Sequence, residues 1–300
     1  MTNNKIQAFL ILSVLLLSCS ATILAQALPS TDIYLIPVIP GKGEFALGQP
    51  KNITHRDGYD NQPSFLADGK NILYTSIRED AQADIYRYDI EKDTSVRVTN
   101  TPESEYSATL MPDGTHFSVV RVEKDTTQRL WKFNLDGTNP ELVLKGIKPV
   151  GYHCWLDSQW VALFILGEPN LLVLTDIHTE KPITIANNIG RSLHTVPGAN
   201  GMSFVEKQTD STWYIKAFDF ETKYPAMIIR TLPDKEDFAW LPDGTILMAS
   251  GSTLFKFNVQ TDTSWTQLTD FSNDGITSIT RIAVSPDGSN IAIVGIPGKK

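Results

Sequence analysis

The sequence has 300 residues, of which 41% are hydrophobic and 20% charged, a composition typical of a folded globular protein rather than a disordered or collagen-like chain. The formal net charge is −8, whereas nucleic-acid-binding proteins present a basic surface, so the composition argues against that function. Two cysteines are too few for a disulfide-stabilised scaffold.

The N-terminal residues 1–27 have the pattern of a secretory signal peptide. Lys5 precedes an apolar run over residues 8–19, and Ala25-Gln26-Ala27 resembles a cleavage site. We therefore expect cleavage after Ala25 or Ala27, and a periplasmic or secreted protein made of residues 28–300. Two alternatives remain open. Cys19 could be the lipidated residue of a membrane-anchored lipoprotein, or the apolar segment could stay uncleaved as an anchor.

A turn motif recurs along the rest of the chain. Clean or degraded copies of Pro-Asp-Gly place equivalent positions at Asp68, Asp113, Asp157, Gly198, Asp243 and Asp287. The spacings between these positions are 45, 44, 41, 45 and 44 residues. A single copy predicts nothing more than a tight turn. Five spacings this similar indicate a repeated structural unit.

Each repeat contains four segments in which apolar and polar residues alternate with the period of a β-strand. One strand precedes the turn and a second follows it, as in residues 116–122. An aromatic-rich third strand comes next, as in residues 130–133, and a fourth closes the unit, as in residues 96–99. Four strands in about 40 to 45 residues is the arrangement of a β-propeller blade.

The two ends of the chain complete one blade. After Asp287 the sequence has room for one more strand, which leaves the sixth blade two strands short. Near the N-terminus, Thr31-Asp32-Ile33-Tyr34 resembles the third-strand sequence Ala83-Asp84-Ile85-Tyr86, and Ile53-Thr54 stands where a fourth strand is expected. We predict an all-β fold, a six-bladed β-propeller of four-stranded blades, closed by two N-terminal strands joining two C-terminal strands.

These repeats resemble the TolB-like propeller family. The resemblance rests on the Pro-Asp-Gly turns, on Asp84-Ile85-Tyr86 and on residues 59–65, and it covers the whole of residues 28–300. It implies a propeller fold and a periplasmic location. TolB itself carries an α/β domain ahead of its propeller, and this sequence has only the predicted signal peptide there. Related propellers include metal-dependent oligogalacturonate lyases.

The innermost strands of a propeller line its central channel, so residues at equal distances before each turn are expected at equal depth. We expect a polar mouth where the loops lead into these strands, and there a protein or peptide ligand would bind. The candidate contacts are Asp60, Gln62, Arg78, Glu105, Arg121, Tyr152, Arg191, Glu236, Asp237 and Arg281.

Two histidines support an alternative function. His153 and His194 occupy equivalent positions in neighbouring blades, and with a further ligand they could hold a divalent metal such as manganese or zinc. Arg191 and Arg281 would then hold an acidic sugar, as in a metal-dependent carbohydrate-active enzyme. Two equivalent histidines also arise by chance and can simply bind water or backbone, and we consider this the better interpretation.

Sequence motifs for catalysis are otherwise absent. The sequence contains neither G-x-S-x-G nor H-E-x-x-H, and Cys154, on an innermost strand, is expected to be a buried structural thiol. We therefore predict a monomeric, non-catalytic binding module of the cell envelope that needs no cofactor. Its partner would be an envelope protein or peptide, with no nucleic acid and no membrane span after the signal peptide is removed.

Overall fold

The computed structural model describes residues 29–41 and 45–298, so the predicted signal peptide, including Cys19, lies outside the described residues. Within this part of the chain the secondary structure is β-strand apart from one 3₁₀ turn, η1 (Ser272–Asp274). No described segment forms a helix with the length and hydropathy that a bilayer span requires.

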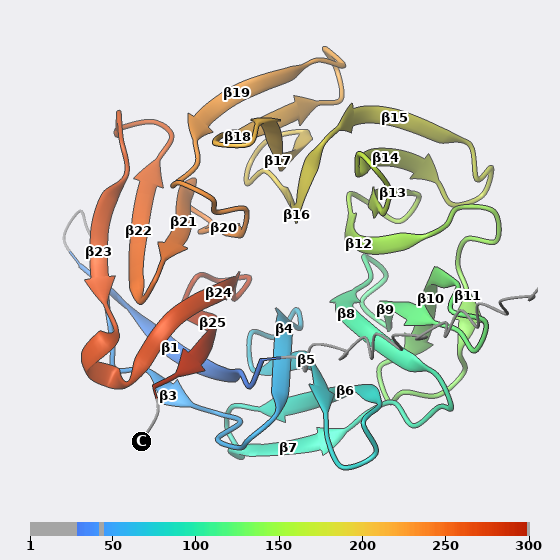
Figure 1. The fold of residues 1–300 in the computed structure, drawn as a ribbon, viewed down its shortest axis with the longest axis horizontal. Helices are drawn as coiled ribbons and strands as arrows, with labels where there is room; N and C mark the ends of the chain where they lie inside the picture. The colour runs from blue at the N-terminus through green and yellow to red at the C-terminus, as the bar shows by residue number, and fades with distance from the viewer. Residues whose placement is uncertain (1–28, 42–44, 299–300) are drawn as a thin grey trace, which may run out of the picture.

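Six antiparallel sheets surround a central channel, as Figure 1 shows in a view along the ring axis. Blade 1 consists of β4 (Tyr59–Phe65), β5 (Asn71–Ile77), β6 (Ala83–Asp89) and β7 (Thr94–Arg97). Blade 2 consists of β8 (Ser104–Leu110), β9 (His116–Val122), β10 (Gln128–Asn134) and β11 (Glu141–Leu142). Blade 3 consists of β12 (Val150–Trp155), β13 (Trp160–Ile165), β14 (Leu171–Asp176) and β15 (Pro182–Asn187).

The remaining sheets continue the ring. Blade 4 consists of β16 (Ile189–Thr195), β17 (Gly201–Thr209), β18 (Thr212–Asp219) and β19 (Pro225–Arg230). Blade 5 consists of β20 (Phe238–Trp240), β21 (Thr245–Ser250), β22 (Thr253–Asn258) and β23 (Thr266–Asp270). Blade 6 consists of β24 (Ile276–Val284), β25 (Asn290–Pro297), β1 (Asp32–Pro40), β2 (Phe45–Leu47) and β3 (Lys51–Asn52).

Blade 6 confirms the predicted ring closure. β1 pairs with β25 in antiparallel register from Asp32–Gly295 to Pro37–Asn290. Its outer edge differs in detail from the prediction, because the fourth strand is β3 and Ile53 follows it with a backbone bond to Ile33. The additional strand β2 pairs with the far end of β1 and is not apparent from the repeat.

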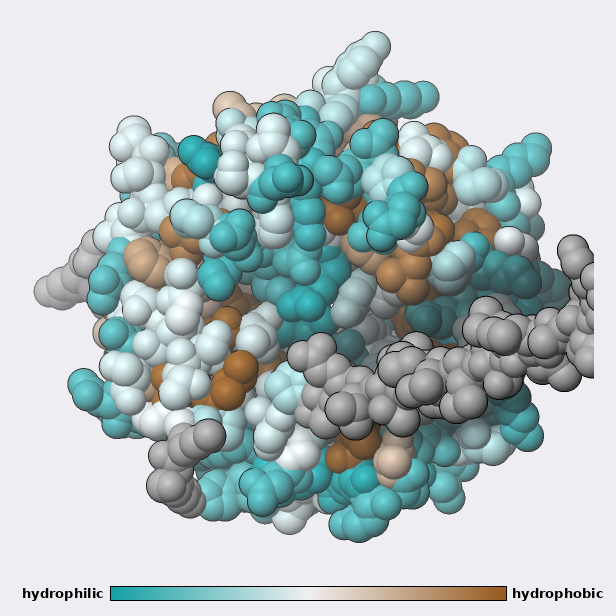
Figure 2. All heavy atoms as spheres, in the orientation of Figure 1, coloured by the Kyte–Doolittle hydropathy of each residue, from teal (hydrophilic) through white to brown (hydrophobic). Residues whose placement is uncertain are grey.

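The core lies between the blades rather than in the middle of the ring. Ile33 and Leu35 of β1 pack with residues of blade 1, whereas Tyr34 and Ile36 pack with residues of blade 5. β1 is therefore buried on both faces, and the alternation of its side chains joins two neighbouring blades. Figure 2 shows the corresponding surface pattern on one face, with hydrophilic side chains near the centre of the ring.

Two tryptophans connect neighbouring blades in the same way. The indole Nε1 of Trp155, on β12, donates to Ser118 Oγ on β9 at 2.8 Å. The indole Nε1 of Trp240, on β20, donates to Ser203 Oγ on β17, also at 2.8 Å. Each bond satisfies a buried indole and links the innermost strand of one blade to the second strand of the preceding blade.

Candidate functional site

The innermost strands carry irregularities at the level of the channel. The β4–β5 register shifts between Asn61 and Ser64, and the β8–β9 register shifts between Tyr106 and Thr109. Gln62 (φ 58°) and Ser107 (φ 55°), the residues six before their turns, adopt left-handed backbone conformations there. Such bulges change the direction in which side chains point.

Gln62 connects two blades at this level. Its Oε1 accepts hydrogen bonds from Thr75 Oγ1 and from the backbone N–H of Ser107, both at 2.8 Å. The side chain is thus held by blade 1 and blade 2 together, and it lines the channel.

The channel contains a cavity of about 900 Å³. Residues from all six innermost strands line it, and Pro112, Pro197, Pro242 and Pro286 from the turns surround its open end. The cavity therefore extends toward the Pro-Asp-Gly turns, the end opposite to the mouth in which the sequence pattern placed the candidate contacts.

Four side chains form what we call the channel floor: Tyr152, Arg191, Asp237 and Arg281. Arg281 Nη2 donates to Tyr152 Oη at 2.8 Å, and its guanidinium carbon lies 5.0 Å from the centre of the Tyr152 ring. These residues belong to blades 6 and 3, which stand opposite each other in a ring of six. Their contact therefore spans the channel.

Asp237 joins the two arginines of the channel floor. Arg191 Nη2 lies 2.5 Å from Asp237 Oδ2 and Arg191 Nε 3.1 Å from the same oxygen, whereas Arg281 Nη1 lies 3.5 Å from Asp237 Oδ1. Burial lowers the pKa of Arg191, but the Asp237 carboxylate more than offsets this effect and the pKa is raised overall. Arg191 thus stays charged, and both arginines contact the Asp237 carboxylate.

A second, smaller cavity of about 190 Å³ is lined by Arg191, Asp237 and Arg281 and by residues 234–236. Glu236 lies here, with one carboxylate oxygen 2.7 Å from Lys207 Nζ and the other 3.5 Å from Arg191 Nε. The same three side chains border both cavities, so the channel floor separates the two spaces.

Tyr59, at the start of β4, lies close to the channel floor. Burial raises the pKa of Tyr59 to about 12, and the positive charges of Arg281 and Arg191 oppose this rise. The hydroxyl is therefore protonated at neutral pH and remains a hydrogen-bond donor.

Other predicted contacts lie between blades instead of in the channel. Glu105 is fully buried, with Oε1 2.5 Å from Thr101 Oγ1 and 3.2 Å from Arg121 Nε. Arg121 also pairs with Glu103 at 2.5 Å and lies over the Trp131 ring. These charged groups thus have partners within the protein, and the structure does not bring them together with the channel floor.

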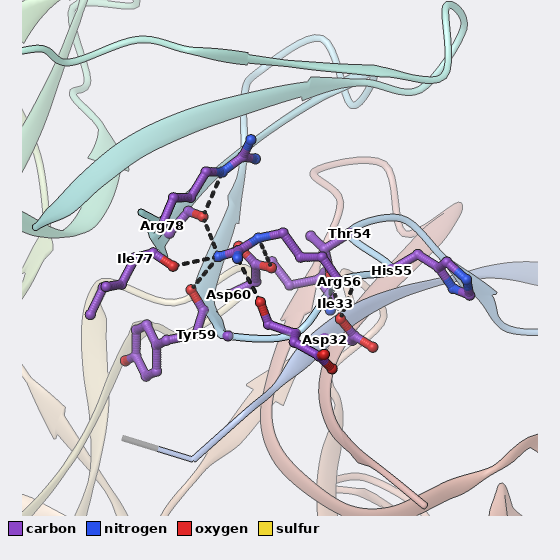
Figure 3. A network of polar contacts seen from close by, with 12 residues as sticks. Asp32, Ile33, Thr54, His55, Arg56, Tyr59, Asp60, Ile77 and Arg78 are labelled. Atoms are coloured by element: carbon purple, nitrogen blue, oxygen red, sulfur yellow. Dashed lines mark hydrogen bonds and ion pairs between the residues drawn. The ribbon is translucent and has the colours of Figure 1, made fainter. Parts of the chain in front are cut away.

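Asp60 occupies the position in blade 1 that Glu105 occupies in blade 2, and it is also fully buried. Arg56, which the sequence pattern did not single out, holds it through Nε at 2.9 Å from Oδ2 (Figure 3). Arg56 Nη2 also donates to the carbonyl of Ile77 at 2.6 Å. Burial raises the pKa of Asp60 despite this arginine.

Arg78 lies beside this network. Its Nε donates to Ser76 Oγ at 3.2 Å, and its guanidinium carbon stands 3.8 Å from the centre of the Tyr86 ring. Figure 3 shows Arg78 next to Arg56, and Arg78 does not line the larger cavity. The repeat spacing correctly predicted the blades, but it does not indicate which polar side chains bond to other groups of the protein.

Both histidines line the channel, and each has a serine partner. His153 Nε2 lies 2.7 Å from Ser118 Oγ, and His194 Nε2 lies 2.9 Å from Ser192 Oγ. Burial lowers the pKa of His153 to about 3 and that of His194 to about 4, so both are neutral. In the described part of the chain, no group of three His, Cys, Asp or Glu side chains is arranged to hold a metal.

Cys154 is a free, half-buried cysteine on β12. Burial raises the pKa of its thiol to about 12, which leaves little thiolate at neutral pH.

No protein-family model matches the sequence. A solved structure of a protein assigned as TolB from Agrobacterium tumefaciens superimposes with a TM-score of 0.69 at 13% identity, covering 89% of this chain and 98% of that chain. The chain has a TolB-like six-bladed propeller fold. TolB from Acinetobacter baumannii also matches this TolB-like propeller, with a TM-score of 0.58 at 14% identity, covering 90% of this chain and 65% of that chain. The predicted resemblance is confirmed at the level of the fold.

Proposed function

We propose that this TolB-like propeller is an exported, non-catalytic binding module of the cell envelope, which takes up a peptide segment of a partner protein in its channel. The observation that carries the proposal is the cavity of about 900 Å³, open at the turns and closed by the polar channel floor. Cavities of this size, with apolar walls and a few convergent polar groups, are typical binding sites.

The rigidity of the site supports binding. Gln62 bridges blades 1 and 2, and Arg281 contacts the opposite blade, so several lining side chains are already fixed. Binding to groups that are already ordered costs little additional conformational entropy. Export rests on the sequence pattern of residues 1–27, with lipidation at Cys19 as the alternative.

The metal-dependent carbohydrate enzyme finds less support. His153 and His194 are each bonded to a serine, and among residues 29–41 and 45–298 neither belongs to a group of three His, Cys, Asp or Glu side chains that could hold a metal. Neutral imidazoles can bind metal, but a catalytic zinc site typically has three protein ligands and these two histidines supply two.

The test is capture of partners from an envelope extract by the protein, with a channel variant as comparison. Asp237→Asn combined with Arg281→Gln removes one negative and one positive charge, so the net charge of the channel is unchanged and Arg191 keeps its contact with Glu236. We expect a partner protein that the wild type captures to be absent from the material captured by this variant. Circular dichroism should show that the wild type and the variant are both folded.

A surface control distinguishes loss of the site from loss of charge. Lys132→Gln combined with Glu141→Gln removes an ion pair on the outer strands β10 and β11, and neither residue lines the cavity, so this variant should leave capture intact. Equal capture by wild type and channel variant would refute binding in the channel. No capture by the wild type, with turnover of acidic oligosaccharides that a chelator abolishes, would favour the enzyme.

A further inference from the structure

We propose that the channel floor anchors a free carboxylate, the C-terminal carboxylate of a peptide, on Arg281, Tyr152 and Arg191. This inference rests on the proposed function and specifies the chemistry of its ligand. It follows from the charges in the cavity, from the remaining hydrogen-bonding capacity of the floor and from the closed shape of the channel.

Positive charge exceeds negative charge in the cavity although the protein as a whole is acidic. Among the described residues that line the larger cavity, the charged ones are Arg191, Arg281 and Asp237, and the two histidines there are neutral. Within this cavity the two guanidinium groups share the Asp237 carboxylate. Glu236 also lies 3.5 Å from Arg191, but on the side of the smaller cavity, where Lys207 is its nearer partner. A second carboxylate would complete the pairing, and partial enclosure by protein strengthens such charge-assisted bonds.

The channel floor also has hydrogen-bonding capacity for that second carboxylate. Arg281 makes its short bond to Tyr152 and a long contact of 3.5 Å to Asp237. Because an arginine has five N–H donors in a planar fork, it can turn a pair of them toward a ligand. Tyr152 accepts the bond from Arg281, so its own hydroxyl hydrogen can donate to the same ligand.

The shape of the cavity selects a chain end. Tyr152 and Arg281 meet across the channel, so an extended chain that enters past the turns cannot thread through the ring. Its terminus is the part that reaches the floor. An N-terminal ammonium would face two arginines, whereas a C-terminal carboxylate would be paired by them. Pro112, Pro242 and Trp240 offer apolar surface to the side chains behind that terminus.

The proposal is tested by affinity selection from a synthetic library of random heptapeptides with free C-termini, beside the same library with amidated C-termini. Peptides that co-elute with the protein in size-exclusion chromatography are identified by mass spectrometry. We expect the free-acid library to be enriched about tenfold or more over the amidated one, the factor that one charge-assisted hydrogen bond provides.

Three variants assign this preference to the channel floor. Arg281→Gln should abolish the preference for the free acid, and Asp237 remains paired with Arg191 in this variant. Tyr152→Phe keeps the ring contact with Phe164 but removes the hydroxyl, and should reduce the preference. Arg129→Gln is the control. It alters an arginine of β10 that pairs with Glu123, and it should retain the preference for the free acid.

Equal enrichment of both libraries, or of neither, would overturn the carboxylate anchor. An unchanged preference in Arg281→Gln would also overturn it. A galacturonate trimer is titrated against the protein in parallel. If the trimer binds saturably and free-acid peptides are not enriched, the carboxylate that the channel floor binds belongs to a sugar and not to a peptide. The capture experiment can still succeed after any of these results, because a partner could insert an internal loop, so the two proposals fail separately.

Discussion

At the scale of single residues, Glu105 is the described carboxyl group whose pKa burial raises most. The side chain is fully buried, and one of its oxygens, Oε2, has no hydrogen-bond partner among the described residues. Burial raises the pKa of Glu105 to about 7, although Thr101 and Arg121 favour the charged form. The folded protein therefore holds this proton at a pH where the unfolded chain has released it.

The pH dependence of stability follows from this difference. Because the pKa in the folded protein lies above the ordinary value of 4.5, Glu105 lowers the free energy of unfolding as pH rises from about 4.5 to about 7. Glu105→Gln removes this proton equilibrium. Relative to the variant, we expect the wild type to lose about 2–3 kcal/mol between pH 5 and pH 7.5, from 1.4 kcal/mol per pKa unit. Urea unfolding at each pH measures the loss.

Glu141→Gln serves as the control, because Glu141 is an exposed residue of β11 paired with Lys132. Its stability should follow the wild type at each pH. Parallel curves for the wild type and Glu105→Gln would contradict a raised pKa at this carboxyl.

At the scale of elements, the Pro-Asp-Gly turns show why the repeat is so visible in the sequence. Asp113 Oδ1 accepts the backbone N–H of Thr115 at 2.8 Å, and Asp287 Oδ1 accepts that of Ser289 at 3.0 Å. Gly114 (φ 67°) and Gly288 (φ 72°) adopt the left-handed conformation that the turn requires. Each residue of the motif therefore has a local role that does not depend on the neighbouring blade.

Two of these glycines differ in their surroundings. A Cβ added at Gly288 would lie 2.9 Å from Cδ of Pro242 in blade 5, whereas one added at Gly114 would meet nothing within 4 Å. Both alanine variants pay about 1–2 kcal/mol for the left-handed backbone. Gly288→Ala should lose about 1–3 kcal/mol more, as overpacking typically costs. Thermal or urea unfolding of the pair measures the difference, and equal losses would contradict the contact between turns.

At the scale of the whole molecule, β1 links the first and last blades of the ring. Ile36 is fully buried, pairs with Ile291 of β25 and belongs to the same core cluster as Leu247 of blade 5. A strand buried on both faces should unfold together with its neighbours and not separately.

Ile36→Ala tests this cooperativity, with an expected cost of about 2–5 kcal/mol for the cavity it leaves. All six tryptophans lie in blades 2 to 5, outside the closing blade. We expect their fluorescence and the far-ultraviolet circular dichroism to shift to the same lower urea midpoint. Fluorescence that keeps the wild-type midpoint, while the dichroism shows an early transition, would mean that blade 6 unfolds locally.

The repeat, the number of blades and the closure of the ring could all be predicted from local sequence patterns. Turn residues and strand alternation act over a few neighbouring positions, so they can be recognised without the rest of the molecule. The copies at Asp113 and Asp243 are clear because Pro, Asp and Gly each meet a local conformational requirement. For the same reason the positions that face the channel, such as Gln62 and Arg281, were predictable by counting back from each turn.

Which polar side chains contact one another in the channel depends on the tertiary structure. Arg281 and Tyr152 are 129 positions apart and come together because their blades are opposite in a closed ring. Glu105 and Asp60 were expected at the mouth, yet both are fully buried. Thr101 and Arg121 lie against Glu105 and Arg56 lies against Asp60, and no local sequence pattern indicates these contacts. The channel floor therefore depends on ring geometry and on strand bulges, which combine distant parts of the chain.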